Sequence, residues 1–224
     1  MQHAIQELLE QPGIWRANER RHSLSHEGSG HIPTGFSALD SVLPGGGLPP
    51  DALTEILHDR HGIGELQLVM PALARLSRGG RWIAMVAPPF LPYAPALAAQ
   101  GMNLSRILTI HPGDHSQSLW AVEQALRAGT CAAVMVWPQR CDERSLRRLQ
   151  LAAEAGNSMG LLFRDMTAAR SRSPAALRLV LGERQQQQLD VRILKCRGTP
   201  AGRIALDTWS ATPVRRQQAL ALDD

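Results

Sequence analysis

Lysine is almost absent from this chain, and cysteine and aromatic residues are also scarce. The one lysine among 224 residues is Lys195, so the net charge of +4 is carried by arginine, and aromatic side chains make up 4% of the sequence. The three cysteines, Cys131, Cys141 and Cys196, are odd in number and show no C-x-x-C spacing. This pattern gives no disulfide framework and no zinc motif, and it fits a reducing compartment.

Long apolar runs are missing as well. No stretch of about eighteen apolar residues occurs, so we expect no transmembrane helix and no membrane partner. The first residues lack a basic start followed by an apolar run, so we expect no secretory signal and a cytoplasmic location. The hydrophobic content of 44% is enough for one sizeable core, and a charge of +4 does not by itself indicate a nucleic-acid-binding protein.

Apolar runs and amphipathic segments alternate through the middle of the chain. We expect strands at 53–57, 81–86, 107–111, 132–137 and 159–163, and helices at 36–43, 65–77, 92–99, 117–128 and 143–155. Strands that are nearly continuous apolar runs, together with amphipathic helices, predict an α/β fold with a mostly parallel sheet covered by helices on both faces. After Pro174 we expect a short helix and then an antiparallel hairpin of strands 189–196 and 203–208.

The ends of the chain differ from this middle part. Ile5, Leu8 and Leu9 form a helical apolar stripe, and Trp15 follows the Pro-Gly pair that ends it. We therefore expect an amphipathic helix in 1–15, a linker in 16–32, a core domain in 33–208 and a mobile tail in 209–224.

The connection from the strand at 53–57 to the helix at 65–77 has the form of a phosphate-binding loop without its chemistry. It runs from His58 to Glu65 and keeps Gly62 and Gly64. A working loop presents a lysine and a hydroxyl at its end, which bind the phosphates and Mg²⁺. Glu65 stands there instead, and a carboxylate beside a triphosphate is repulsive. We expect no nucleotide binding here and interpret the histidines as solvated loop residues.

The order of these features resembles the RecA core. The segment 33–40 is similar to the "TG…LD" segment that precedes the nucleotide loop in that family, and the resemblance extends from about residue 32 to 207. Besides the loop, the end of the strand at 81–86 lacks the catalytic glutamate of RecA-like ATPases. Trp137-Pro138 replaces the aspartate that binds magnesium. The chain is thus predicted to be no enzyme and to need no cofactor.

Segments 9–16, 62–66, 81–84, 87–95 and 147–155 are similar to the ImuA family of RecA/SulA-like accessory proteins. The resemblance implies a role in DNA damage tolerance, as part of SOS-induced mutagenic translesion synthesis. It also implies an ImuB-like Y-family polymerase homologue as partner; RecA, an error-prone replicative-type polymerase, the sliding clamp and a second copy of the chain are further candidates. Two alternatives remain open: a SulA-type inhibitor that binds the tubulin-like division GTPase, and an ATP-dependent DNA-binding protein with an atypical loop.

Candidate contact residues fall into four groups. The apolar stripe of the first residues with Trp15, and the clamp-peptide-like tail, are candidate partner-binding segments. A basic stripe on the helix at 143–155 is a third candidate, and arginines after the strand at 159–163 are candidate single-stranded DNA contacts without an aromatic platform. The alternatives are docking on the chain's own core for the apolar stripe, an unpacked tail for the clamp-peptide-like segment, and a solvated face or loop for the two arginine groups. The residues are Ile5, Leu8, Leu9 and Trp15; Arg215, Arg216, Gln217, Leu220 and Leu222; Arg144, Arg147 and Arg148; and Arg164, Arg170 and Arg172.

Overall fold

The computed structural model describes residues 30–182, 188–196 and 202–207. The strands are β1 (Leu53–His58), β2 (Trp82–Val86), β3 (Ile107–Ile110), β4 (Cys131–Val136), β5 (Met159–Asp165), β6 (Leu177–Leu181), β7 (Gln188–Cys196) and β8 (Gly202–Asp207). The helices are α2 (Ser37–Asp40), α3 (Glu65–Ser77), α4 (Ala94–Ala99), α5 (His115–Arg127) and α6 (Glu143–Gly156), with short 3-10 turns η1 (Pro44–Gly46), η2 (Leu104–Arg106) and η3 (Met166–Arg170).

These strands form one sheet in the order β3-β2-β4-β5-β1-β6-β7-β8. The six strands from β1 to β6 pair in parallel, whereas β7 pairs antiparallel with β6 and β8. The predicted α/β class, the mostly parallel sheet and the C-terminal antiparallel hairpin are therefore confirmed. Most side chains of the parallel strands are apolar because both faces of this part of the sheet are covered.

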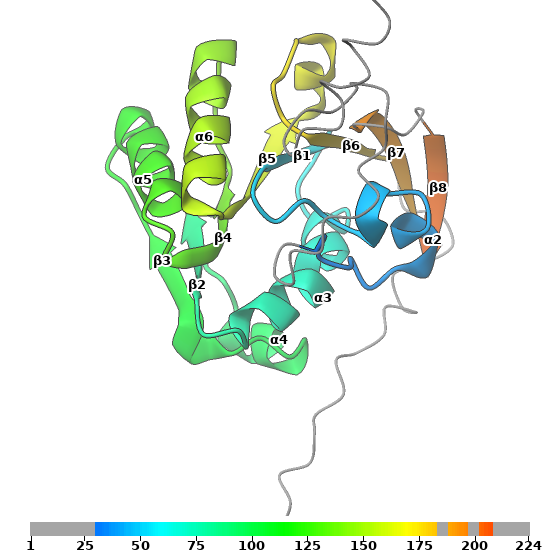
Figure 1. Ribbon diagram of the computed structural model, residues 1–224, viewed down its shortest axis with the longest axis horizontal. Coiled ribbons are helices and arrows are strands. Elements are labelled where there is room, and N and C mark those ends of the chain that lie inside the picture. The colour runs from blue at the N-terminus through cyan, green and yellow to red at the C-terminus, as the bar shows by residue number, and fades with distance from the viewer. Residues whose placement is uncertain (1–29, 183–187, 197–201, 208–224) are drawn as a thin grey trace, which may run out of the picture.

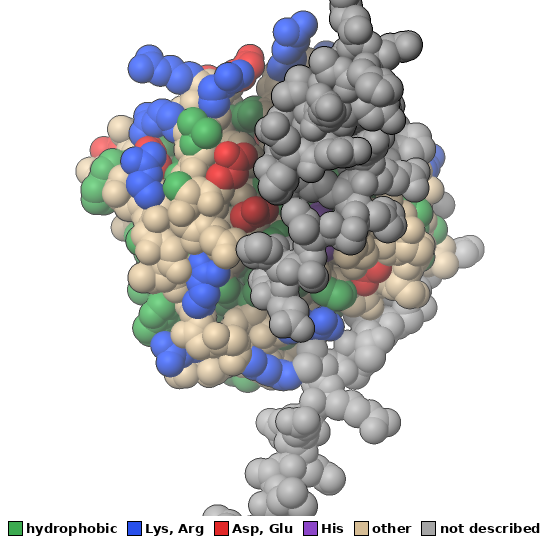
Figure 2. Space-filling model, in the orientation of Figure 1, with side chains coloured by type: hydrophobic (Ala, Val, Ile, Leu, Met, Phe, Trp, Pro, Cys, Tyr) green, Lys and Arg blue, Asp and Glu red, His purple; other side chains and the backbone are tan. Residues whose placement is uncertain are grey.

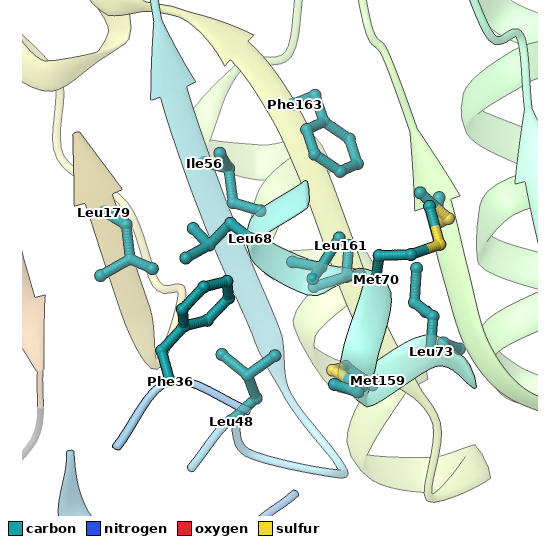
Figure 3. Close-up of a cluster of buried hydrophobic side chains, with 14 of the residues drawn as sticks. Phe36, Leu48, Ile56, Leu68, Met70, Leu73, Met159, Leu161, Phe163 and Leu179 are labelled. Carbon is teal, nitrogen blue, oxygen red and sulfur yellow. The ribbon is translucent and has the colours of Figure 1, made fainter. Parts of the chain in front are cut away.

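Helices cover the two faces of the sheet in separate layers (Figure 1). α5 and α6 pack on one face, where Leu126 and Leu149 join a core with Val134. α3 packs on the other face. Figure 3 shows its side chains Leu68, Met70 and Leu73 directed at the sheet, where they join the larger core. The loops that follow the parallel strands gather at one edge of the sheet, because all these strands run in the same direction.

A buried charge cluster ties the central strands together. Glu55 of β1 is fully buried and forms ion pairs with Arg164 of β5 and Arg178 of β6. Arg178 also donates to the carbonyl oxygens of Ala168, at 2.7 Å, and Ser171, at 3.0 Å. The carboxylate is thus neutralised by one cation from each neighbouring strand, as a buried charge requires.

One predicted element is wrong. The helix expected after Pro174 is β6, which lies beside β1 in the middle of the sheet. Its sequence Leu-Arg-Leu-Val-Leu is buried along its whole length. Short apolar runs of this kind do not distinguish a buried strand from a helix by periodicity, and here pairing with β1 decides the conformation.

Other expectations agree with the structure to within a few residues at the element ends. The predicted helix in 1–15, the first part of the linker and the tail in 209–224 lie outside the described residues, and the proposed domain boundaries stay predictions. Across the described ranges, no helix is both long and apolar enough to cross a membrane.

Candidate functional site

The loop between β1 and α3 closes on the side chain of Glu65. The backbone N–H of Gly62 donates to Oε1 of Glu65 at 2.8 Å and to Oε2 at 3.1 Å, and the N–H of Gly64 donates to Oε2 at 3.2 Å. Both glycines adopt positive φ, +83° and +118°, which turns their amides toward the carboxylate. Glu65 is only 5% exposed. The carboxylate therefore occupies a nest of backbone amides.

A nest of backbone amides at a helix N-terminus favours the binding of an oxyanion. Successive amides and the positive end of the helix dipole favour a negative charge there. Here that charge belongs to the first residue of α3 itself. An incoming phosphate would meet a buried carboxylate at the position it needs, so the loop is filled rather than vacant.

The neighbouring strand ends also lack phosphate-transfer groups. β2 is followed by Ala87-Pro88-Pro89, and β4 is followed by Trp137, whose ring stacks on Phe163 at 4.7 Å. A cavity of about 630 Å³ lies at the carboxyl ends of these strands. Its walls come from the loops after β1 to β5 and combine proline, histidine and aromatic side chains with charged ones. The charged side chains are Arg60, three aspartates (Asp59, Asp114 and Asp165) and Arg164, which is already paired to Glu55.

His58 departs from the expectation of a solvated loop residue. It is the last residue of β1 and is 4% exposed, and no hydrogen bond of good geometry reaches either ring nitrogen, although the backbone of Arg60 lies near the ring. Burial lowers the pKa of His58, because the imidazolium loses its hydration; the nearby Glu65 charge acts in the opposite direction. The reason for the difference is that the strand continues one residue further than predicted, which carries His58 into the protein.

An apolar patch projects beside this loop. Phe90, Leu91 and Tyr93, in the segment between β2 and α4, are 71%, 83% and 70% exposed. The ring of His61 meets the Phe90 ring edge-on at a centroid distance of 6.1 Å. A groove of about 260 Å³ runs beneath these side chains toward Met70 and is mostly apolar. We name Phe90, Leu91 and Tyr93 the apolar patch.

Sequence reasoning did not single out this patch. The signal was present, because four large or rigid apolar residues, Phe90 to Tyr93, follow a strand in a proline-rich connection where polar residues are usual. Large apolar side chains that stay solvent-exposed together indicate a contact surface for another molecule.

The predicted basic stripe on α6 is partly neutralised. Arg148 pairs with Glu123 of α5, and Arg147 lies 3.8 Å from Glu143. Arg144 is exposed. Figure 2 shows Lys and Arg side chains interspersed with Asp and Glu over α5 and α6, so this face is not a uniform basic surface. A partner-binding role for the stripe stays a prediction.

The arginines predicted to contact DNA divide into two kinds. Arg164 is drawn into the protein, where it pairs with Glu55 and donates to the carbonyl of Cys141 at 2.8 Å. Its side chain is 12% exposed, so it offers little surface to a phosphate. Arg170 and Arg172 are exposed. The remaining candidates, Ile5, Leu8, Leu9 and Trp15 with Arg215, Arg216, Gln217, Leu220 and Leu222, lie outside the described residues.

Comparison with known proteins gives one consistent result. The family model described as "Cell division inhibitor SulA" matches residues 52–160, from the start of β1 to the first residues of β5. A cell division inhibitor SulA of Pectobacterium atrosepticum is 28% identical over 143 residues, which are 63% of this chain and 82% of the relative. That of Edwardsiella piscicida is 31% identical over 99 residues, 44% of this chain and 59% of the relative.

This likeness corrects the predicted function. It contradicts the translesion-synthesis role, and with it the ImuB-like, RecA, polymerase and clamp partners, because the relatives are named as inhibitors of cell division. It agrees with the SulA-type alternative. The prediction that the chain is not an enzyme is confirmed, since these relatives are named for an inhibitory activity and not a catalytic one. Over its matched segment, this chain is similar to the cell division inhibitors named SulA.

Proposed function

We propose that this chain is a non-enzymatic inhibitor of cell division that binds the tubulin-like division GTPase. The observation that carries the proposal is the match to the division inhibitors over the segment that contains both the filled loop and the apolar patch. Because Glu65 fills the nucleotide loop, we infer that this protein acts by binding a partner and not by hydrolysing a nucleotide.

We propose further that the core is a degenerate RecA-like domain. The sheet order, with β1 between β5 and β6, supports this proposal, as does the segment that resembles "TG…LD". In that segment the backbone N–H and the hydroxyl of Thr34 both donate to Oδ1 of Asp40, at 2.8 and 2.7 Å. These bonds fix the turn that leads into α2, so the two polar residues of the motif have a structural role here.

The apolar patch is the surface that we assign to the contact with the GTPase. Aromatic residues such as Phe90 and Tyr93 are the types that dominate the energetics of protein interfaces. They project from the protein beside an apolar groove, which gives a partner both a raised and a recessed surface to pack against. Burying them against a partner would remove from water the large apolar area that the free chain leaves exposed.

The test is the affinity of purified chain for the purified division GTPase. The double variant Phe90→Ser, Leu91→Ser should raise the dissociation constant on the order of thirtyfold, which corresponds to the loss of an interface hot spot of about 2 kcal/mol. Trp120→Ser is the matched control, because Trp120 is an exposed apolar residue (62%) on α5, outside the patch. An unchanged affinity in the double variant would rule out the patch, and an absence of binding by the wild type would rule out the function.

A further inference from the structure

We propose that the Glu65 carboxylate is a permanent internal oxyanion, which holds the loop from His58 to Gly64 in one conformation in place of a bound phosphate. The consequence is that the loop needs no nucleotide to be ordered. Removing the carboxylate should open a site for inorganic phosphate. This inference does not depend on the identity of the protein partner.

The first support is the hydrogen-bond pattern. Two amides that face inward, those of Gly62 and Gly64, donate to one carboxylate that comes from the helix they precede. Each of these glycines has a positive φ that other residues rarely adopt. This backbone conformation directs both N–H groups toward the position of the Glu65 carboxylate. Oxygen atoms of a carboxylate and of a phosphate accept hydrogen bonds from such amides in the same way.

The second support is His58, which is independent of the loop amides. It is buried on the cavity side of the loop, and no hydrogen bond of good geometry reaches either ring nitrogen, although the backbone of Arg60 lies close enough to favour the charged ring. A buried imidazole without a well-formed hydrogen bond is rare and requires an explanation. The Glu65 charge interacts with this imidazole, although no hydrogen bond joins them. A bound phosphate is not attached to α3, so its oxygen atoms can approach the His58 ring more closely than the Glu65 carboxylate does and accept a hydrogen bond from it.

Ring contacts connect the loop from His58 to Gly64 with the apolar patch. The rings of His58 and His61 lie 5.0 Å apart, and His61 meets Phe90 at 6.1 Å. The loop that Glu65 closes therefore supports one side of the Phe90 ring. Switch segments of nucleotide-binding proteins are ordered by the charge of a bound γ-phosphate, whereas here the glutamate supplies a negative charge to the loop at all times.

The experiment compares the wild type with Glu65→Ala by amide hydrogen exchange and thermal unfolding. In the variant, exchange at Gly62 and Gly64 should accelerate by roughly tenfold, the factor expected for the loss of a charge-assisted hydrogen bond. Inorganic phosphate should slow that exchange again. It should also raise the melting temperature of the variant by about 3 °C relative to chloride of equal ionic strength. Neither phosphate nor ATP should affect the wild type in this way.

Glu143→Ala is the matched control. Glu143 also begins a helix after a parallel strand, but the N-terminus of α6 is capped by Asp142, whose Oδ1 accepts from Ser145 N at 2.8 Å. Phosphate and chloride should act alike on this variant. Glu65→Ser repeats the test in case Glu65→Ala does not fold. Equal exchange in wild type and variant, or identical effects of phosphate and chloride on the folded variant, would each overturn the proposal.

Discussion

Replacing Glu55 by glutamine should severely destabilise the chain, because this substitution removes only the negative charge of the buried cluster. The carboxylate has no exposed surface, and its two partners, Arg164 and Arg178, are 12% and 6% exposed. Glutamine keeps nearly the same shape and one acceptor oxygen. Two guanidinium groups would then lie in the protein without a counter-charge on β1.

The magnitude follows from that burial. Removing one partner of a buried ion pair costs about 3–5 kcal/mol, because the remaining charge stays desolvated and uncompensated. Arg178 retains its bonds to two backbone carbonyls, which do not replace a full charge. For a chain of this size, that loss corresponds to a fall in the melting temperature of about 10 °C.

The assay is urea unfolding followed by far-UV circular dichroism. The midpoint should fall with an unchanged slope, since the same surface is exposed on unfolding. Glu143→Gln is the control, because Glu143 pairs with Arg147 on the surface at 3.8 Å and should contribute no measurable stability. A loss below about 1 kcal/mol in Glu55→Gln would refute the reasoning, because it would mean that the arginines are solvated or neutralised by other groups.

Three further outcomes are expected. Because burial lowers the pKa of His58 below the unfolded value of 6.5, the stability that its neutral form provides is present above pH 6.5 and is lost as the pH falls toward the folded pKa; His58→Leu should flatten this slope in unfolding titrations. Burial raises the pKa of Cys141 to about 11, so mass spectrometry should show that iodoacetamide modifies this thiol far more slowly in folded than in urea-unfolded chain. Gly156→Ala should cost about 3 kcal/mol in urea unfolding, since its Cβ would lie 1.8 Å from the carbonyl oxygen of Leu126.

Each of these outcomes has a comparison that can contradict it. An identical pH slope in wild type and His58→Leu would show that other groups cause the pH dependence. Equal labelling rates of Cys141 in folded and unfolded chain would mean that the thiol is solvated. Gly30→Ala introduces a Cβ with no atom within 4 Å, so a cost equal to that of Gly156→Ala would show that the close approach to Leu126 is not the cause.

Local patterns in the sequence predict much of this fold. The bounds of α3 follow from Gly64 before it and from Gly79 and Gly80 after it, which make any longer helix costly. The parallel strands β1 to β5 follow from their nearly continuous apolar runs. β6 could not be predicted in this way, because its five residues are strand only by virtue of pairing with β1 and β7.

The site was predictable in its charge but not in its geometry. Glu65 at the end of the loop indicates that phosphate is repelled, and this follows from the residue type alone. That its carboxylate turns back onto the amides of Gly62 and Gly64 depends on the two positive φ angles, which glycine permits but does not specify. The burial of His58 and the exposure of Phe90 depend on neighbours from distant segments, so neither could be read from local sequence.

The most direct test of the account is an assembly assay with the purified division GTPase. Polymer formation with GTP is followed by light scattering and sedimentation, with increasing amounts of this chain and without ATP. Polymer mass should fall as the chain approaches equimolar amounts, and added ATP should change nothing. Unchanged polymer mass in the presence of excess chain would contradict inhibition of the division GTPase, and an effect that required ATP would contradict the filled loop.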